Sequence, residues 1–280
     1  MHRLEKRKRR EKALVQVRET TQMAGVNDLV MRKVLVTGMS GLIGRAVRKQ
    51  LEGKYELSAL NRSPVEGVQW YQADIYDLNA ILPAFECKDF VVHLAAVSRD
   101  DAPWEDLLRN NIVGTYNVFE ASRRAGVKRI IYASSGATVA GWEQIFPYNA
   151  IVEGRYHEVP ASWAKLTHQS PTRPGGLYGC TKIWGEAIAW DYSNTYGISA
   201  ICLRIGGVNL EDRPFLPRHF SVWCSQRDVA RMIQKCIEAP ESLKFDIFYV
   251  VSKNKWNYRD LDHARELVGF EPQDTADRYC

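Results

Sequence analysis

A tyrosine and a lysine four residues apart, Tyr178 and Lys182, form the pair in this sequence that is best suited to proton transfer. On a helix this spacing places both side chains on the same face, one turn apart. A tyrosine with an unperturbed pKa of about 10 is a poor base at neutral pH, but a nearby ammonium group stabilises the phenolate and lowers that pKa. The pair therefore predicts a tyrosine that exchanges a proton with a substrate hydroxyl group.

A second motif consists of three glycines, Gly38, Gly41 and Gly44, between a β-branched segment and a segment with helical periodicity. In a strand–turn–helix unit the first glycine permits the tight turn, the second lets the backbone approach a pyrophosphate, and the third lets the helix pack close to the strand. Leu42 and Ile43 stand at the start of the helix, where free N–H groups and the helix dipole attract phosphates. The motif predicts a dinucleotide cofactor, NAD or NADP.

The residues that follow the second expected strand bear on the choice between these two cofactors. An NAD enzyme usually has an acidic residue there, which holds the 2′-hydroxyl of the ribose. This sequence has Asn61 followed by Arg62. A carboxylate would repel a 2′-phosphate, whereas a guanidinium group would bind it. Both residues are therefore candidate cofactor contacts that favour NADP, with a solvated Arg62 as the alternative.

The segments around these motifs alternate between short β-branched runs and helical patterns, which is typical of a parallel sheet with right-handed crossovers. Strands are expected at residues 33–37, 55–60, 68–71, 90–94, 128–133, 198–204 and 245–251, and helices at 41–51, 78–85, 106–125, 178–196 and 226–238. The predicted fold class is α/β: a doubly wound parallel sheet, or Rossmann fold, with a small C-terminal substrate-binding portion. We expect one nucleotide-binding domain at 31–276, with substrate-binding parts at about 142–172 and 205–276.

Composition indicates a globular protein and excludes several other classes. Of the 280 residues, 45% are hydrophobic and 25% are charged, and no apolar run approaches the ~18–20 residues that a membrane span needs. The six cysteines include no CxxC pair, which predicts neither a zinc site nor a redox motif and suits a reducing cytoplasm. We therefore expect no metal, no membrane partner and a cytoplasmic location.

The formal net charge of +5 comes mostly from residues 1–30, which carry eight basic and four acidic side chains. The rest of the chain is close to neutral, which predicts no nucleic-acid partner for it. Residues 1–30 show no hydrophobic period and are expected to form a disordered basic extension. The basic run at 6–10 leaves open a patch for nucleic acid or an anionic surface. Alternatively, Met31 resembles the natural start of the domain, and the segment before it results from a misassigned start of the protein.

With Thr37 before the glycines, the glycine motif resembles the short-chain dehydrogenase/reductase superfamily in its extended branch, the NAD-dependent epimerase/dehydratase family. Further resembling segments are Asp74-Ile75, which looks like the pair that holds the adenine ring, and His93–Ala96, which looks like the strand end beside the ribose. The segment from Asn111 to Val118 matches the central helix of this branch. The resemblance implies cofactor contacts from Asp74, Ile75, Leu94, Ala95, Ala96, Asn111, Tyr178, Lys182 and Ile205.

The same resemblance supplies the third catalytic residue and a supporting one. Ser135, at the end of the fifth expected strand, is implied to be the catalytic hydroxyl that holds the substrate oxygen against Tyr178. Ser134 would line the strand end. Asn111 would support Lys182 through water, and its neighbour Asn110 is the alternative for that role.

Within this branch the chain looks most like uronate dehydrogenases and their sugar-dehydrogenase relatives, over about residues 31–276. The resembling blocks lie at residues 102–105, 108–112, 133–135, 173–179, 203–206 and 262–272. In uronate dehydrogenases an arginine after the sixth strand binds the sugar carboxylate, and the matching position is Arg218. A guanidinium group suits a carboxylate because it donates two parallel hydrogen bonds. Arg213 is a rival for this role, and a surface arginine is the other interpretation of Arg218.

Two features depart from the uronate dehydrogenase pattern. Family members usually follow the serine pair with Asn and His, which touch the substrate, whereas this sequence has Gly136 and Ala137. Residues 142–172 also look longer than usual. Aromatic side chains with polar tips suit a lid over a sugar or ordinary loop packing; those in this segment, with its two histidines, are Trp142, Tyr148, Tyr156, His157, Trp163 and His168.

The residues and the resemblance together predict an NAD(P)-dependent oxidoreductase that acts on a small-molecule sugar. Tyr178 would take a proton from a sugar hydroxyl, at the anomeric carbon, while hydride passes from that carbon to the nicotinamide, so that a cyclic aldose or uronate becomes a lactone. A nucleotide-sugar epimerase or dehydratase with tightly bound NAD remains an alternative, as does a cofactor-binding regulator without chemistry. Relatives often pair through helices like those at 106–125 and 178–196, which leaves a homo-oligomer open.

Overall fold

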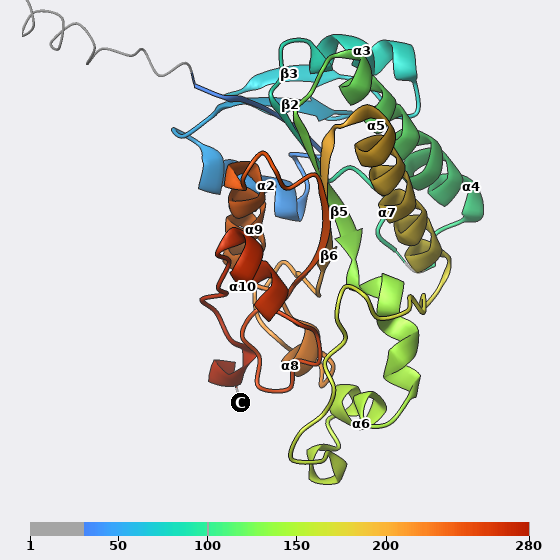
Figure 1. The fold of residues 1–280 in the computed structure, drawn as a ribbon, viewed down its shortest axis with the longest axis vertical. Coiled ribbons are helices and arrows are strands. Elements are labelled where there is room, and N and C mark those ends of the chain that lie inside the picture. Colours follow the sequence, from blue (N-terminus) through green and yellow to red (C-terminus); the bar gives the residue numbers. More distant parts are fainter. Residues whose placement is uncertain (1–30, 100, 280) are drawn as a thin grey trace, which may run out of the picture. The chain divides into compact units, whose positions relative to one another are not determined.

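The computed structural model describes residues 31–99 and 101–279, so the prediction for the basic extension at 1–30 lies outside the described residues. Seven parallel strands form one sheet in the order β3-β2-β1-β4-β5-β6-β7 (Figure 1). The strands are β1 (Lys33–Thr37), β2 (Glu56–Asn61), β3 (Gln69–Gln72), β4 (Phe90–His93), β5 (Arg129–Ser135), β6 (Ser199–Ile205) and β7 (Phe245–Val250). Each lies within two residues of its predicted bounds.

The strand order reverses between β1 and β4, which are neighbours in the sheet although two strands separate them in sequence. The segments of the chain that follow β1 and β4 therefore cross to opposite faces of the sheet. In doubly wound folds the crevice at the carboxyl ends of these two strands is the usual ligand site. The predicted fold class is confirmed, and the strand order fixes where a ligand is expected.

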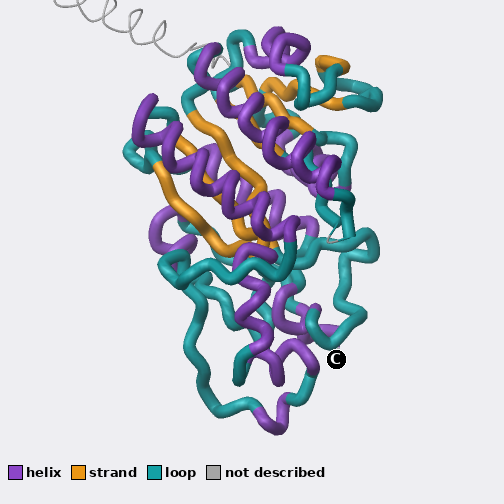
Figure 2. Tube along the Cα trace, turned by 90° about the vertical axis from the view of Figure 1, so that its right-hand side faces the viewer, coloured by secondary structure: helices purple, strands orange, loops and turns teal. Residues whose placement is uncertain are grey.

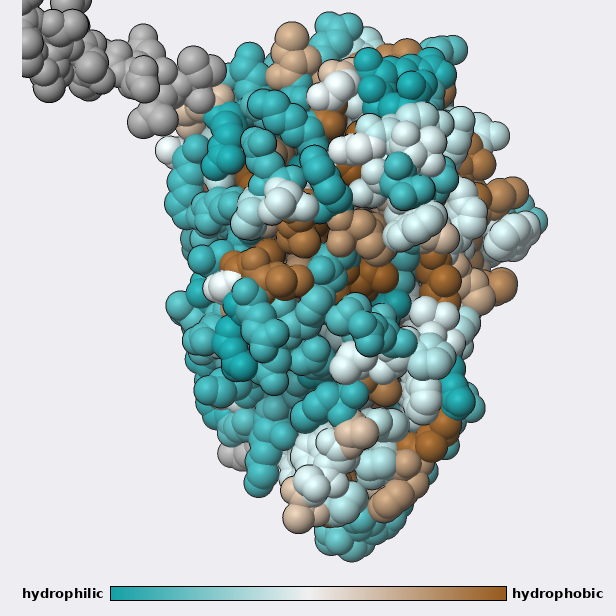
Figure 3. Space-filling model, in the orientation of Figure 1, coloured by the Kyte–Doolittle hydropathy of each residue, from teal (hydrophilic) through white to brown (hydrophobic). Residues whose placement is uncertain are grey.

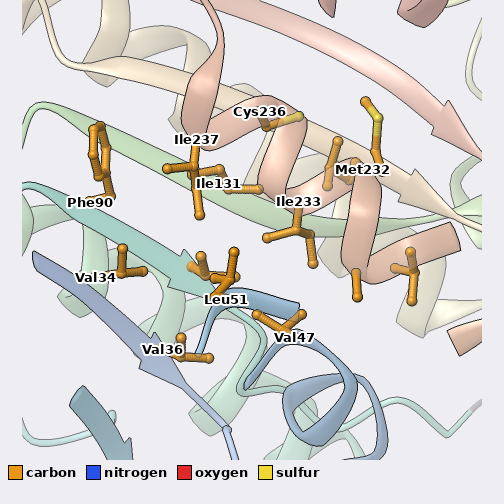
Figure 4. Packing of buried hydrophobic residues seen from close by; sticks show 14 of the residues in the cluster. Val34, Val36, Val47, Leu51, Phe90, Ile131, Met232, Ile233, Cys236 and Ile237 are labelled. Atoms are coloured by element: carbon orange, nitrogen blue, oxygen red, sulfur yellow. The ribbon is translucent and has the colours of Figure 1, made fainter. Parts of the chain in front are cut away.

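Helices cover both faces of the sheet. On one face, side chains of α2 (Leu42–Leu51) and α9 (Gln226–Glu238) are buried against the sheet. On the other face, the buried side chains come from α3 (Leu78–Phe85), α5 (Gly114–Arg124) and α7 (Leu177–Tyr196). Figure 2 shows α5 and α7 running side by side across their face. On the opposite face, Val47 and Leu51 of α2 and Ile233 of α9 pack over Val34 and Val36 of β1 (Figure 4).

The helix predicted at 106–125 is interrupted rather than regular. It consists of α4 (Trp104–Leu107), a π-helical segment η1 (Leu108–Val113) and then α5. Asn110 and Asn111 in this segment are buried, and their side chains bind backbone groups outside the regular helical pattern. Such π segments are frequent at functional sites, and Asn110 of this one lines the cleft described below.

A smaller portion beyond the carboxyl ends of β5 and β6 contains α6 (Tyr148–Glu153) and α8 (His219–Val222) (Figure 1). It also includes η2 (Gly136–Gln144), η3 (Tyr156–Glu158) and η4 (Ala276–Tyr279), whereas α10 (Asp262–Val268) packs beside α9. A separate hydrophobic cluster ties residues of 139–166 to Val222, Tyr249 and Tyr258. This cluster joins the segment after β5 to the loop after β6, to β7 and to the loop that follows it. That these segments bind substrate stays a prediction.

The aromatic side chains of 142–172 pack on one another and on the C-terminal loops. Tyr156 stacks on Trp256 with ring centres 4.1 Å apart, and Trp163 also stacks on Trp256, with ring centres 5.7 Å apart. The indole of Trp142 donates to the carbonyl of Pro171, and the rings of His168 and His263 stack at 3.9 Å. The structure thus favours loop packing over a lid for these residues.

The left-hand side of the surface shown in Figure 3 is mostly hydrophilic, apart from a hydrophobic patch at mid-height. Among residues 31–99 and 101–279, none of the helices combines the length and the apolar character that crossing a bilayer requires. Within the same residues, no three His, Cys, Asp or Glu side chains lie together in a way that could hold a metal ion.

Candidate active site

A cleft of about 420 Å³ lies at the carboxyl ends of the strands, at the switch between β1 and β4. It brings together all but one of the residues predicted to bind the cofactor: Gly38, Gly41, Leu42, Ile43, Gly44, Asn61, Arg62, Asp74, Ile75, Leu94, Ala95, Ala96, Tyr178, Lys182 and Ile205. Residues that the sequence analysis did not assign to the cofactor also line it: Ser40, Leu60, Ser63, Ala73, Ser98, Asn110, Ala133, Ser134 and Val208. Most of these residues are sequence neighbours of a predicted cofactor contact. Their positions at the ends of the expected strands could therefore have identified them.

The glycine turn requires glycine at two positions. Gly38 has φ +74°, a left-handed conformation, and a Cβ there would lie 2.8 Å from the backbone nitrogen of Ala95. A Cβ on Gly44 would lie 2.4 Å from the carbonyl oxygen of Gly38. Both glycines therefore allow three backbone segments to approach closely. The turn presents the start of α2, at Leu42, to the cleft, as a phosphate site requires.

Asn61 supports this turn with its side chain. Its Oδ1 accepts a hydrogen bond from the N–H of Met39 at 2.8 Å, and its Nδ2 donates to Oγ of Ser40 at 2.6 Å. The sequence analysis treated Asn61 only as a ribose contact, and it did not foresee this positioning of the turn. Arg62 is exposed at the rim of the cleft, where its guanidinium group is accessible to a ligand.

The predicted adenine end of the cleft is held by Asp74. Its Oδ1 accepts from the N–H of Tyr76 at 3.0 Å, and its Oδ2 accepts from Nη2 of Arg109 at 3.1 Å. The Arg109 guanidinium group also lies 4.4 Å above the ring of Tyr76. Ile75 is buried under Gly114, where a Cβ would meet its side chain at 2.6 Å. These contacts fix the positions of Asp74 and Ile75 at this end of the cleft.

Lys182 and Tyr178 face the cleft together from the first turns of α7. Lys182 is 4% exposed, and its Nζ donates to the carbonyl of Ala133 at 2.8 Å. Nζ lies 5.7 Å from the centre of the Tyr178 ring. Burial lowers the pKa of Lys182 to about 8, and the carboxylate of Glu186 limits that fall. Lys182 is therefore still charged at neutral pH and can stabilise negative charge on the phenol oxygen.

A buried charge pair anchors α7 to the sheet, and the sequence analysis did not predict it. Arg204 of β6 is 2% exposed, and its Nε and Nη2 donate to the two carboxylate oxygens of Glu186 at 2.9 and 2.8 Å. Ser134 also donates to Glu186, at 2.6 Å, and Arg204 donates to the hydroxyl of Tyr249 at 3.1 Å. This network fixes the helix that carries Tyr178 relative to the ends of β5 and β6.

The two serines at the end of β5 have different surroundings. Ser134 lines the cleft, and its hydroxyl is committed to Glu186. Ser135 does not line the cofactor cleft; its Oγ accepts from the N–H of Ala137 at 3.1 Å and caps η2. As an acceptor from Ala137, Ser135 keeps its own proton available to a substrate oxygen. Its catalytic role stays a prediction.

Asn111 differs from its predicted place. It is fully buried and does not line the cleft, because its amide exchanges hydrogen bonds with the backbone of Val97 at 2.8 and 2.9 Å and donates to Oγ1 of Thr181 at 3.1 Å. Its contact with Thr181, next to Lys182, positions the start of α7. Asn110, which the sequence left as the alternative, lines the cleft instead.

Arg218 forms a bidentate ion pair with Glu143, which the sequence did not indicate. Its Nε and Nη2 donate to the carboxylate of Glu143 at 2.6 and 2.7 Å, and Tyr258 donates to the same carboxylate at 2.5 Å. Burial opposes ionisation of Glu143, but Arg218, Arg259 and Tyr258 offset it and hold the pKa of Glu143 below its usual value. Arg213, the rival candidate, is exposed. Neither arginine lines the cofactor cleft.

His93, at the end of β4, is buried in a polar chain next to the cleft. Oγ1 of Thr37 accepts from the N–H groups of Leu94 and Ala95, so its own proton is donated to Nδ1 of His93 at 2.8 Å. Nε2 of His93 is then the protonated nitrogen and donates to Thr115 at 3.3 Å. Burial, helped by the charge of Lys182, lowers the pKa of His93 to about 3.

The lowered pKa of His93 predicts sensitivity to acid. The unfolded histidine binds a proton near pH ~6.5 and the folded one only near pH 3, so stability falls as pH decreases between these values. We expect a His93→Gln variant to lose stability less steeply between pH 6 and 4, by up to about 1.4 kcal/mol per pH unit. Urea unfolding at several pH values measures this, and equal slopes for both proteins would contradict it.

Comparisons with known proteins agree with this geometry. The model of the NAD dependent epimerase/dehydratase family matches residues 34–267. The NAD-dependent glucose-6-phosphate dehydrogenase of Haloferax volcanii is 32% identical over 253 residues, with 87% of this chain and 94% of the relative covered. The L-arabinose 1-dehydrogenase (NAD(P)(+)) of the same organism is 28% identical, with 88% and 98% covered.

Solved structures give the same result. A crystal structure of a mutant uronate dehydrogenase from Agrobacterium tumefaciens, complexed with NAD, matches with a TM-score of 0.75 and 31% identity, covering 89% of this chain and 87% of that one. The family predicted from the glycine motif and the segments that resemble this branch is thus confirmed. This chain belongs to the NAD dependent epimerase/dehydratase family.

Proposed function

We propose that this chain oxidises the CH–OH group of a sugar or sugar acid and passes the hydride to NAD or NADP. The observation that carries the proposal is the cleft itself, in which the glycine turn and the Tyr178–Lys182 face of α7 line one continuous space. The relatives named above are dehydrogenases of glucose 6-phosphate, L-arabinose and uronate, which supports a sugar as the substrate.

The cleft fits a dinucleotide. Its glycine turn brings backbone N–H groups to the start of α2, and the approach of segments at Gly38 and Gly44 leaves no room for side chains there. When bound, the nicotinamide cofactor supplies an acceptor for hydride. Gly41, Leu42 and Ile43 would hold its phosphates, Asp74 and Ile75 its adenine side, and Lys182 its nicotinamide ribose.

In the proposed reaction the C–H bond at the anomeric carbon breaks with its electron pair, and the O–H bond on that carbon loses its proton to Tyr178. The new C=O bond makes a cyclic sugar into a lactone. The ammonium of Lys182 stabilises the phenolate that takes the proton, and its hydrogen bond to Ala133 keeps it there. Ser135 donates to the same substrate oxygen and orients it.

The substrate-binding part is proposed to come from residues 142–172 and 205–276. Side chains of the first range pack with Val222, Tyr249 and Tyr258 of the second in one hydrophobic cluster. The scattered cysteines further support the proposal that the protein works in the cytoplasm.

Arg62 is proposed to let the enzyme use NADP. An Arg62→Ala variant is expected to raise KM for NADP by about 10- to 100-fold and to change KM for NAD by less than about threefold, since only NADP carries the 2′-phosphate. Steady-state kinetics with both cofactors measure this. Equal changes for the two cofactors, or a wild-type enzyme that uses NAD alone, would contradict the proposal.

A panel of sugars tests the proposed function directly. The protein is mixed with NAD or NADP and with glucose, arabinose, glucose 6-phosphate or glucuronate, and absorbance at 340 nm is followed. Net formation of reduced cofactor with at least one sugar is expected. An epimerase or a regulator would give no net signal, because the first returns the hydride to the sugar and the second transfers none.

A further inference from the structure

Tyr132 presents its ring to the ammonium group of Lys182. It stands on β5, three residues before Ser135, and its side chain is 1% exposed. The Nζ atom of Lys182 lies over the Tyr132 ring, 5.0 Å from the ring centre. Tyr132 does not line the cleft, whereas Lys182 does. A role of Tyr132 in the reaction would therefore act through Lys182.

Lys182 keeps its charge at a buried position with little help from ion pairing. Its Nζ donates to the carbonyl oxygen of Ala133 at 2.8 Å. The carboxylate that acts on it, that of Glu186, is paired with Arg204 at 2.8 Å. Removing an ammonium group from water is costly, so other attractive groups must offset the cost. The face of an aromatic ring within about 6 Å is such a group, and desolvation strengthens its attraction for a cation.

Three further titratable groups near Lys182 are neutral at neutral pH. Burial, together with the charge of Lys182, lowers the pKa of His93 on β4 to about 3. Burial raises the pKa of the Cys202 thiol on β6 and of the Tyr132 phenol itself. The ring of Tyr178, on the same helix as Lys182, has its centre 5.7 Å from Nζ. Of the two tyrosine rings, that of Tyr132 lies nearer to the ammonium group.

The fold holds the ring of Tyr132 from three elements. Phe119 of α5 meets it edge-on with ring centres 6.2 Å apart, and His93 of β4 lies at 5.8 Å. On α7, Gly185 stands one turn after Lys182, and a Cβ there would lie 2.1 Å from the Tyr132 hydroxyl oxygen. A glycine in the interior of a helix is destabilising, and the ring for which it makes room accounts for this one. The close approach of α7 to β5 therefore depends on both residues.

We infer that Tyr132 is a positioning residue for the Tyr178–Lys182 pair: the face of its ring holds the ammonium group of Lys182 in place and stabilises its charge. This inference rests on the proposed function and adds a residue to the same site. With the ring in place, Lys182 keeps its proton and stabilises the phenolate of Tyr178. Without the attraction of the ring, burial would favour the neutral amine, which would stabilise that phenolate less.

NMR of protein with ¹³C-labelled lysine Cε atoms measures the protonation of Lys182, whose signal is the one missing from a Lys182→Arg spectrum. The pKa of Lys182, lowered by burial to about 8, is expected to fall by about one further unit in Tyr132→Leu. Tyr132→Phe keeps the ring and should change this pKa by less than about 0.3 unit. Tyr192→Leu is the matched control, since it removes another buried ring that packs under α7, and it should leave the pKa of Lys182 unchanged.

A fluorinated ring separates the attraction of the ring face from packing. Trifluorophenylalanine at position 132 keeps nearly the shape of phenylalanine, but its fluorine atoms withdraw electron density from the face that attracts the cation. The pKa of Lys182 should then be about 0.5 to 1 unit lower than in Tyr132→Phe. This comparison stays available if Tyr132→Leu does not fold, because shape is conserved. An equal pKa of Lys182 with both rings would show that Tyr132 acts only in packing, and would overturn the inference.

Turnover at two pH values gives a second readout. At pH 8 the kcat of Tyr132→Leu should be about fivefold below that of wild type, and at pH 6.5 within about twofold, because a lower pKa leaves more of Lys182 neutral only at the higher pH. A packing defect would lower kcat by the same factor at both pH values, and that result would contradict the role in positioning.

The NMR measurement needs neither sugar nor cofactor, which keeps this inference distinct from the proposed function. If the pKa of Lys182 responds to the ring as expected and no sugar is oxidised, the proposed function fails alone. If sugars are oxidised and the pKa of Lys182 does not respond to the loss or fluorination of the ring, the inference fails alone.

Discussion

Replacing Tyr178 by phenylalanine is expected to lower kcat by about 10²- to 10⁴-fold, the range that one proton-transferring side chain contributes. The change removes the phenol oxygen and keeps the ring that lines the cleft. The cofactor contacts from the glycine turn and from Lys182 remain, so the Kd for NAD should change by less than about threefold. Absorbance at 340 nm gives kcat, and calorimetry gives the Kd.

The control for this variant is Tyr116→Phe, which deletes the same oxygen from an exposed tyrosine on α5. It should keep wild-type activity. If Tyr178→Phe kept more than about a tenth of the wild-type kcat, Tyr178 would not be the proton acceptor. If it lost NAD binding as well, its effect would be on cofactor placement rather than on proton transfer.

Glu186→Gln is expected to lower the free energy of unfolding by about 3–5 kcal/mol, the usual cost of breaking a buried ion pair from one side. Arg204 would keep its charge with 2% exposure and lose its charged partner, and Ser134 would lose a charged acceptor. Because this network fixes α7 on the sheet, kcat should fall too, although Glu186 does not line the cleft. Urea unfolding followed by tryptophan fluorescence measures the stability.

Glu52→Gln is the matched control, since Glu52 is 62% exposed and its partner Arg48 is 3.6 Å away at the surface. Its cost should stay below about 1 kcal/mol. A double variant, Glu186→Leu with Arg204→Met, should be more stable than Glu186→Gln, because it removes both buried charges. Similar stability of Glu186→Gln and Glu52→Gln would mean that the buried pair does not anchor α7.

The strands and the cofactor cleft could be predicted from the sequence because their signals are local. The run 33–44 specifies a strand, a tight turn and a helix by β-branched residues and glycines that are close in sequence. Parallel pairing then brings the carboxyl ends of β1, β2, β3, β4, β5 and β6 to one edge of the sheet. Residues at those ends, such as Asp74 and Ala95, must therefore lie near the glycine turn, and they do.

The features that the sequence did not reveal depend on contacts between distant segments. Glu186 and Arg204 meet because α7 packs on β6, and Arg218 meets Glu143 across 75 residues. In the π-helical segment, Asn111 bonds the backbone of Val97 in another loop, a contact that a periodic pattern could not show. The oligomeric state stays a prediction for the same reason: no pattern within one chain specifies its partner.

A sugar labelled with deuterium at the anomeric carbon tests the central claim most directly. The protein is incubated with NAD and C1-deuterated glucuronate or glucose 6-phosphate, and both products are analysed by mass spectrometry. The account predicts that the deuterium appears in the reduced cofactor and that the sugar becomes a lactone. Deuterium that stays on the sugar, with no labelled reduced cofactor, would contradict it.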